Sequence, residues 1–396
     1  MDAARPSRWT IRSTLEVSYE VRETRGLLDP ECSELARVPH GQVIDEPRLV
    51  VLDDRVADIY GHRVRRYFET REVSVNYLTV PAVEARKSMD VVLLVAARLN
   101  DLGTNRLSSP PVVIGGGVVA DVVGLAASLY RRGIPYVRVP TTLLSQVDVS
   151  VAAKTGVNFG GYRNRLGSYA PPPITLIDRE FLRSLPARHV RNGMGEILKM
   201  ALVADRRLFE LLESHGDELV RSRLQDDRRG AGPTVADEVI SRAIEGMVGQ
   251  LAPNLWEKDL RRLVDYGHTF SPLIEMTALP ELLHGEAVAI DCIFSALLSA
   301  HRGLLSWAEV GRLIGVARSL GLQVSHPLFC DVDVVTRALA DTQRHRDGRQ
   351  NLPLLTTIGA ATFADDISGF ELGIACRSMS ELLDGPAVDQ NAGKAV

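Results

Sequence analysis

The first 185 residues alternate short β-forming runs with helical patterns, and this alternation restricts the fold more than any other feature of the sequence. Strands that alternate with helices favour a mostly parallel sheet covered by helices. We therefore expect a Rossmann-like α/β nucleotide-binding domain over residues 1–185. The expected strands are RLVVLD (48–53), VVLLV (91–95), PVVIGGG (111–117), IPYVRVP (134–140) and ITLID (174–178).

The pattern changes after residue 185. The stretch VRNGMGEILKMALVADRRLFELLES, at 190–214, places apolar residues three to four positions apart, which is typical of helices. Further helical patterns follow to the end of the chain. Because 396 residues are enough for two domains, we expect a second, mainly α-helical domain over 186–396.

Composition excludes several classes of partner. The 46 basic and 50 acidic residues give a net charge of −4 with the two signs interspersed, so we expect no nucleic-acid or membrane partner. The four cysteines show no metal-ligand spacing and are too sparse for a disulfide framework. Every apolar stretch is interrupted well before the roughly 20 residues that span a bilayer, and we expect a cytoplasmic protein.

A glycine turn follows the third expected strand. The sequence GGGVVAD, at 115–121, lies between a β-rich run and a helical pattern. Glycines there would let the backbone approach a pyrophosphate at the positive end of the helix. The turn lacks the usual GxGxxG pattern, so a plain tight turn remains an equal alternative.

The segment 140–169 is unusually rich in hydroxyl, amide and cationic groups. Lys154, Arg163 and Asn164, together with the upstream Arg132, are candidate donors to a phosphate. Asp148 is a candidate partner for a sugar hydroxyl or a ribose. The alternative is a solvated loop with surface ion pairs.

Two histidines and one glutamate are candidate metal ligands. Glu196 and Lys199 lie three apart, hence on one face of a helix, where a simple ion pair is the alternative. His268 and His284 each stand beside a glycine and near an acidic residue, although a histidine in such a context is often only structural. Two imidazoles and one carboxylate would bind a divalent zinc ion with one position open to substrate. The zincin motif HExxH is absent.

Seven motifs, in order, resemble those of the dehydroquinate synthase-like sugar phosphate cyclases. The resemblance covers about residues 48–360, and it implies a two-domain fold, NAD, zinc or cobalt, and a homodimer acting on a small sugar phosphate. The motifs are GGGVVADVVGLAASLYRRG, PTTLL, VDVSVAAKTGVN, RNRLGSY, GEILK, GHTF and HGEAV.

The resemblance also implies roles for individual residues. It places Glu196, His268 and His284 as the metal ligands. The NAD contacts that it implies are Asp53, Glu84, Lys87, Gly116, Gly117, Asp121, Thr141, Thr142, Asp148, Lys154 and Arg163, the last replacing a lysine. The catalytic and substrate contacts that it implies are Arg132, which would reach across the dimer, Asp148, Lys154, Asn164, Lys199, Arg261 and Asp265. Arg344 and Arg346 are further phosphate candidates, unless they form a solvated basic turn.

Three departures concern the substrate. Met247 stands where dehydroquinate synthases have a lysine that binds the substrate carboxylate, Asp265 where they have asparagine, and Pro272 where they have histidine. A buried carboxylate without its cation is penalised, so a neutral polyol end would fit better. With PNLWE at 253–257, these changes resemble the 2-epi-5-epi-valiolone synthase branch, whereas VDVSVAAKTGVN is closer to dehydroquinate synthase and leaves the product epimer open.

The expected reaction is therefore cyclisation of sedoheptulose 7-phosphate with loss of phosphate, in C7-cyclitol natural-product biosynthesis. The resemblance implies transient oxidation by NAD, β-elimination, reduction and intramolecular aldol closure, which is the chemistry of a carbon–oxygen lyase. The alternatives are a 2-epi-valiolone synthase, a 3-dehydroquinate synthase, a metal-dependent alcohol dehydrogenase and an inactive regulatory paralogue.

Overall fold

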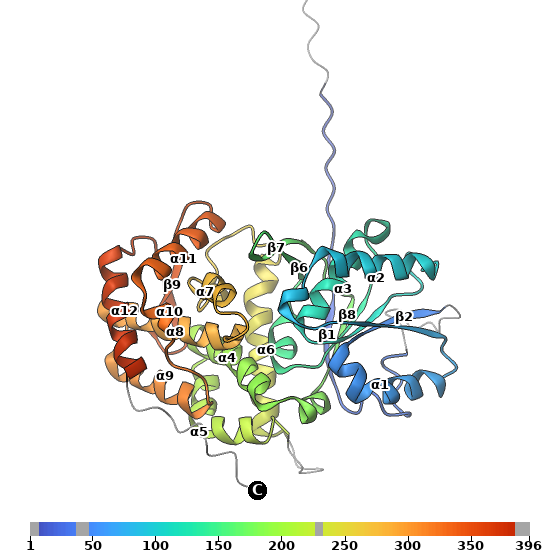
Figure 1. Ribbon diagram of the computed structural model, residues 1–396, viewed down its shortest axis with the longest axis horizontal. Coiled ribbons are helices and arrows are strands. Elements are labelled where there is room, and N and C mark those ends of the chain that lie inside the picture. Colours follow the sequence, from blue (N-terminus) through green and yellow to red (C-terminus); the bar gives the residue numbers. More distant parts are fainter. Residues whose placement is uncertain (1–7, 37–46, 226–232, 385–396) are drawn as a thin grey trace, which may run out of the picture.

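A six-stranded parallel sheet forms the first half of the protein in the computed structural model, which describes residues 8–36, 47–225 and 233–384 (Figure 1). The strand order is β1-β8-β5-β4-β2-β3, and every neighbouring pair is parallel. The predicted parallel sheet is thus confirmed. The strands are β1 (Glu20–Thr24), β2 (Arg48–Asp53), β3 (Val75–Val80), β4 (Val112–Gly115), β5 (Val137–Pro140) and β8 (Ile174–Asp178).

Helices cover both faces of this sheet, because its central strands carry apolar residues on both faces. In β2, Val50 and Leu52 pack with α1 (Asp54–Glu69) in one buried cluster. Leu49 and Val51 point to the other face and pack with α2 (Met89–Asp101) and α3 (Gly117–Leu129). A strand that is apolar on both faces is typical of a parallel sheet between two helical layers.

The strand expected at 91–95 is wrong, because these residues form part of α2. Val92, Val95 and Leu99 are buried, whereas Leu93 and Leu94 are exposed. The buried positions recur at three and four residues, the period of a helix with one buried face. A short apolar run does not by itself distinguish a strand from such a helix.

Two short hairpins lie outside the main sheet. The π-helical turn Ser145–Val149 leads to the first hairpin, which β6 (Lys154–Phe159) and β7 (Tyr162–Tyr169) form as an antiparallel pair. The second hairpin pairs β9 (Leu352–Thr357) with β10 (Ala360–Ala364) in the helical half.

The second half is mainly helical, as predicted, and α8 (His284–His301) lies at its centre. Every residue of α8 from 285 to 300 is buried, which is the pattern of a helix surrounded by others. The helix predicted across 190–214 is divided at Asp205, whose side chain caps the next helix by accepting from the amide of Leu208. The other helices are α4 (Ala187–Ala204), α5 (Arg206–Arg221), α6 (Val235–Leu251), α7 (Ser271–Thr277), α9 (Trp307–Ser319), α10 (Pro327–Cys330), α11 (Val332–His345) and α12 (Gly369–Asp384).

The two halves are joined by packing as well as by the chain. Leu143, Val147 and Val151 follow β5 along the chain, but they pack into the helical core with Leu182 and Leu185. The domain boundary at 185/186 stays a prediction. Within the described ranges, no helix is both long and apolar enough to cross a membrane.

One buried carboxylate anchors the loop before α7 to α8. Asp291 accepts hydrogen bonds from the backbone amides of Phe270 (2.7 Å) and Ser271 (2.8 Å) and from the Ser295 hydroxyl (3.1 Å). Burial raises the pKa of Asp291 to about 6, although these donors oppose the shift. The interaction holds the start of α7, where Pro272 contributes no amide proton.

Asp291→Ala should destabilise the protein, because two buried amides would lose their acceptor at about 1–3 kcal/mol each. Asp291→Asn keeps an acceptor oxygen and should lose less, and Ser295→Ala, which removes only a hydroxyl donor, serves as the control. Thermal unfolding followed by circular dichroism checks the order. An Asp291→Ala variant with the same melting temperature as the wild type would contradict this role.

Candidate metal centre and active site

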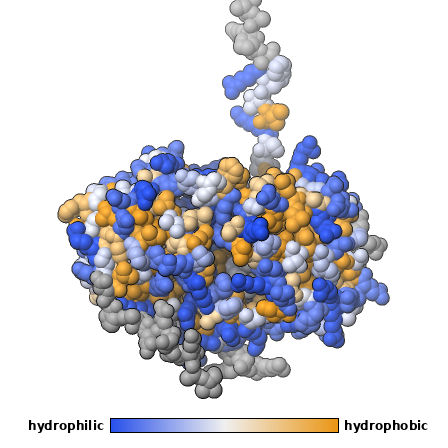
Figure 2. Space-filling view, in the orientation of Figure 1, coloured by the Kyte–Doolittle hydropathy of each residue, from blue (hydrophilic) through white to orange (hydrophobic). Residues whose placement is uncertain are grey.

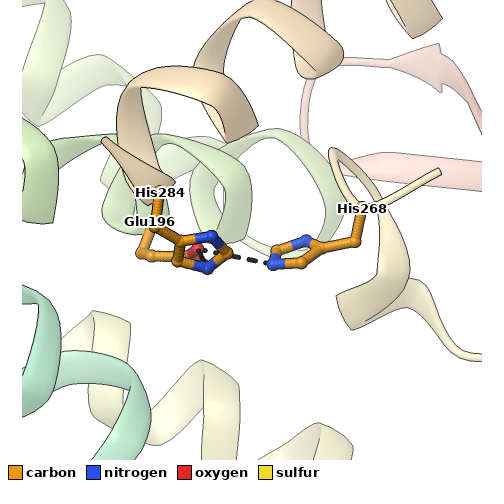
Figure 3. Close-up of side chains that lie close together, drawn as sticks. All are labelled: Glu196, His268 and His284. Carbon is orange, nitrogen blue, oxygen red and sulfur yellow. Dashed lines mark ion pairs between the residues drawn. The ribbon is translucent and has the colours of Figure 1, made fainter. Parts of the chain in front are cut away.

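Glu196, His268 and His284 converge at one point of the helical half (Figure 3). Nε2 of His284 lies 3.2 Å and Nε2 of His268 lies 3.6 Å from Oε1 of Glu196. One ligand atom from each residue falls within 4.8 Å of the others. The structure therefore brings together all three residues that the sequence analysis selected as metal ligands.

Close packing of two helices sets this geometry. Glu196 lies on α4 and His284 opens α8, and the two helices meet at Gly195 and Gly285. A Cβ on Gly195 would lie 2.1 Å from the carbonyl oxygen of Gly285, so only glycine permits this approach. His268 follows Gly267, which has a φ of 73° and faces Cys292 and Val288 of α8.

Each imidazole is oriented through its other nitrogen. Nδ1 of His284 lies 3.0 Å from Oε2 of Glu275, and Nδ1 of His268 lies 3.1 Å from the carbonyl oxygen of Tyr266. The Tyr266 carbonyl fixes the tautomer of His268 in which Nε2 is free to bind a metal, and Glu275 favours the same tautomer of His284. Glu275 was missed in the sequence, where the acid nearest to His284 is Glu286.

Glu286 has a different task at the start of α8. It accepts from the amide of Leu283 and from Arg188, at 2.8 Å in each case. Glu275 becomes the partner of His284 only because α7 folds back against α8. Its spacing of seven residues from His268 is the only local signal that could have pointed to it.

The electrostatics of the three residues suit a divalent cation. Glu196 is buried, and neither carboxylate oxygen has a hydrogen-bond partner of good geometry among the residues that the structure describes. Burial opposes ionisation of Glu196, but Lys199, with Nζ 2.5 Å from Oε2, and the two imidazoles hold the pKa of the carboxyl well below its usual range. Burial lowers the pKa of His268 to about 3, which keeps its Nε2 lone pair available. A carboxylate and two imidazoles are a fitting donor set for zinc.

The carboxyl edge of the sheet carries the predicted nucleotide residues. Strand order reverses between β2 and β4, and ligands of open α/β sheets bind at such a switch point. Asp53 ends β2 and caps α1 by accepting from the amide of Arg55 (2.9 Å). The turn after β4 lies beside it, since a Cβ on Gly115 would come within 3.0 Å of the Asp53 Cβ.

The same turn leaves room for a phosphate. A Cβ on Gly116 would lie 3.2 Å from Thr142, and one on Gly117 would lie 3.3 Å from Val149. The N-terminus of α3 has no side-chain cap, so no side chain occupies its first amides, as an anion site requires. Thr141 continues this edge, with its amide bonded to the Gly115 carbonyl. A dinucleotide pyrophosphate fits this cradle.

Several of the remaining nucleotide candidates form one ionic network. Lys87, buried, has Nζ 2.5 Å from Oδ2 of Asp121 and also donates to Oδ1 of Asn164. Glu84 accepts from Asn158, and its Oε1 lies 3.7 Å from Nε of Arg163. This part of the segment is a strand pair instead of a loop, in which the Arg163 side chain is only 17% exposed whereas Asn164 is exposed.

Arg163 connects this network to the histidines. Its Nη1 donates to Oε2 of Glu275 at 2.7 Å and lies against Nδ1 of His284. Both carboxylates raise the pKa of Arg163 against the effect of burial, with Glu275 contributing more than Glu84. Arg163 therefore links the α/β half to the metal centre, instead of only lining the nucleotide site.

Two other candidates, Asp148 and Lys199, lie around Glu196, and Lys154 acts on Asp148. Burial raises the pKa of Asp148 and Glu196 adds to the shift, while Lys199 opposes it. Lys199 is buried, and the carboxylates of Glu196 and Asp148 raise its pKa despite burial. Lys154, half exposed at the start of β6, forms an ion pair with Glu257, a partner that sequence reasoning missed.

The structure does not bring every candidate into this cluster. Arg132 is exposed after α3, and Arg261 is exposed with its guanidinium 4.9 Å from the Phe363 ring centroid. Arg344 is exposed and lies 3.8 Å from Asp341. Arg346 is buried and donates to the carbonyl of Gln350 at 2.8 Å, so it is not a solvated basic turn.

The three departures that concern the substrate lie in the helical half. Asp265 is buried between two cations, paired with Arg262 and 3.6 Å from Nε of Arg346. Met247 is buried on α6, in the apolar core. Pro272 lies in the first turn of α7.

Comparison with known proteins agrees with this architecture. Residues 77–192 match the model of the 3-dehydroquinate synthase N-terminal domain, and residues 193–344 match that of the C-terminal domain. The 2-epi-5-epi-valiolone synthase of Streptomyces hygroscopicus subsp. jinggangensis (strain 5008) is 48% identical over 94% of this chain and 90% of its own length. The demethyl-4-deoxygadusol synthase of Trichormus variabilis is 35% identical over 93% and 88%.

A solved structure shows the same fold. That of ValA, the Streptomyces hygroscopicus 2-epi-5-epi-valiolone synthase with NAD+ and Zn2+ bound, aligns with a TM-score of 0.88 at 47% identity, covering 94% of this chain and 99% of ValA. Two matching domain models and near-full-length relatives at this identity lead to one conclusion. The chain belongs to the 3-dehydroquinate synthase family of sugar phosphate cyclases.

Proposed function

We propose that the protein cyclises sedoheptulose 7-phosphate to 2-epi-5-epi-valiolone, or a close epimer, and releases inorganic phosphate. The observation that carries the proposal is the convergence of Glu196, His268 and His284 beside Lys199, in a chain 48% identical to a 2-epi-5-epi-valiolone synthase. The reaction is that of a carbon–oxygen lyase in C7-cyclitol biosynthesis.

Glu196, His268 and His284 would hold a divalent zinc or cobalt ion, which supplies Lewis acidity towards a substrate oxygen. Three protein ligands leave a position open for that oxygen. Glu275 supports the centre by fixing the His284 ring. Asp53, the turn at 115–117 and the threonines 141–142 would hold NAD, which supplies a hydride acceptor that each turnover restores.

The buried cation Lys199 faces Glu196 and Asp148, so it lies where negative charge on the substrate can be stabilised without solvent screening. Lys154 is the second cation of the site and is paired with Glu257. A substrate phosphate would replace Glu257 as the partner of Lys154. Phosphate then leaves by β-elimination, and the carbocycle closes by an intramolecular aldol step that depends chiefly on orientation. Asn164 would be the uncharged residue among the substrate contacts.

The substrate end that lacks phosphate is expected to be neutral. Met247 carries no charge, and the two nearby cations already have carboxylate partners: Arg262 pairs with Asp265 and Glu257, and Arg346 lies 3.6 Å from Asp265. A substrate carboxylate would therefore meet a carboxylate and a thioether instead of a cation, which penalises the 3-dehydroquinate synthase reaction. Arg132 stays a proposed contact from a partner copy in a homodimer.

Glu275→Gln should weaken zinc binding about 10- to 100-fold, because the amide no longer orients His284 as a carboxylate does. Competition with a chromogenic chelator measures the affinity directly, without reference to activity. Glu281→Gln is the matched control, since Glu281 is close to His284 in sequence but has its side chain 77% exposed. Equal zinc affinity of the Glu275 variant and the wild type would refute the orienting role.

The protein with zinc and NAD should release phosphate from sedoheptulose 7-phosphate without net accumulation of NADH. His284→Ala should lose turnover and retained zinc together. Net NADH formation would indicate an alcohol dehydrogenase instead. Faster turnover of 3-deoxy-arabino-heptulosonate 7-phosphate would overturn the substrate assignment, and NMR of the product assigns the epimer.

A further inference from the structure

An extended segment before the first strand exposes several large apolar side chains. Residues 8–19, called the arm here, run from the body of the protein as a drawn-out chain that leads into β1 (Figure 1). Trp9, Ile11 and Leu15 are 84%, 95% and 81% exposed. Figure 2 shows the arm standing clear of the surface, with hydrophobic and hydrophilic groups both open to solvent.

The arm has the sequence pattern of a strand with one face covered. Its odd positions carry Trp9, Ile11, Leu15, Val17 and Tyr19, interrupted only at residue 13, and its even positions are polar or charged. Such strict alternation is typical of a half-buried strand. In the part of the chain that the structure describes, residues 8–18 form no hydrogen bond. The first anchor is the Tyr19 hydroxyl, which donates to the Val151 carbonyl at 2.7 Å.

The charges of the arm and of the first residue of β1 identify the partner. Arg8, Arg12, Glu16 and Glu20 recur every four residues on the polar face, two positive and then two negative. If two arms run antiparallel about residue 14, Arg8 lies opposite Glu20, and Arg12 lies opposite Glu16. The same register places Trp9 opposite Tyr19 and residue 11 opposite residue 17.

Other registers lose this match. Moving the centre by one residue leaves Arg12 opposite Thr14 or Ser18, and about residue 15 it also sets Arg8 opposite Arg22. Moving it by two keeps one kind of opposite-charge pair, Arg8 with Glu16 or Arg12 with Glu20, but puts Arg12 or Glu16 opposite itself. A shift by half a residue sets apolar side chains against polar ones, because the two faces of a strand alternate. Opposite charges directly across a strand pair stabilise it, and like charges destabilise it. The pattern is therefore self-complementary about one point, as a two-fold contact requires.

We propose that the arms of two copies of this chain pair as antiparallel strands centred on Thr14. The pairing gives the amides and apolar side chains of the arm a partner that the described residues of a single chain do not provide. It also joins the two copies next to the segment that leads from Asp148 to Lys154, through Tyr19 and Val151. The inference does not depend on which substrate the enzyme uses.

Cysteine cross-linking tests the register. Thr14→Cys places a thiol opposite its own copy, at the short Cα separation that a disulfide needs. Thr10→Cys is the matched control, because two copies of residue 10 would be about 27 Å apart along the pair. Mild oxidation should convert Thr14→Cys to a covalent dimer, and should leave Thr10→Cys at the background of the wild type with its four native cysteines. A mixture of the Thr10→Cys and Ser18→Cys proteins should cross-link, since these positions are opposite each other.

Charge exchange in the Thr14→Cys protein tests the pairing itself. Arg12→Glu or Glu16→Arg alone should slow cross-linking about tenfold at low salt, because both symmetric ion pairs become repulsive. The double exchange Arg12→Glu with Glu16→Arg should restore the rate. The side chains of Arg12 and Glu16 are exposed and lack partners within the described chain, so these exchanges should not affect folding. Cross-linking that is equal for Thr10→Cys and Thr14→Cys, or that is indifferent to the single exchanges, would overturn the proposal.

Discussion

The buried carboxylate of Glu196 is the constraint on which the site depends. A carboxylate inside a helical core is costly unless charged or polar groups surround it, and here Lys199 and two imidazoles do so. The glycine contact between α4 and α8 makes this arrangement sterically feasible, because it brings Glu196 to the first residue of α8. A side chain at either glycine would separate the carboxylate from His284, and the donor set would be lost.

Arg163 connects that centre to the rest of the molecule. It lies between Glu84, on the nucleotide side, and Glu275, behind His284. Charged groups that share a guanidinium cannot move independently, so the hairpin carrying Arg163 couples the position of the α/β half to the orientation of a metal ligand. This coupling suits a reaction in which the nucleotide and the metal act on one substrate. The lysine that the family resemblance implies for this position would provide a point charge instead of the fork that reaches two carboxylates.

Much of the fold was predictable from local patterns. The parallel sheet followed from β-forming runs between helices, and the mainly helical second half followed from apolar periodicity. The strand expected at 91–95 was wrong because five apolar residues carry no period of their own, and only packing against the sheet shows that Val92 and Val95 face inward together. Ordered motifs identified the three converging residues. Glu275 and Glu257 could not be found in this way, because their roles arise from how α7 and the loop after α6 fold back in space.

The sharpest test of the account is a crystal structure of the protein grown with zinc, with diffraction data collected on both sides of the zinc absorption edge. The account predicts one strong anomalous peak between Glu196, His268 and His284, bonded to Nε2 of both rings and to a carboxylate oxygen of Glu196. A fully loaded protein with no peak at these residues, or with zinc held elsewhere, would contradict it.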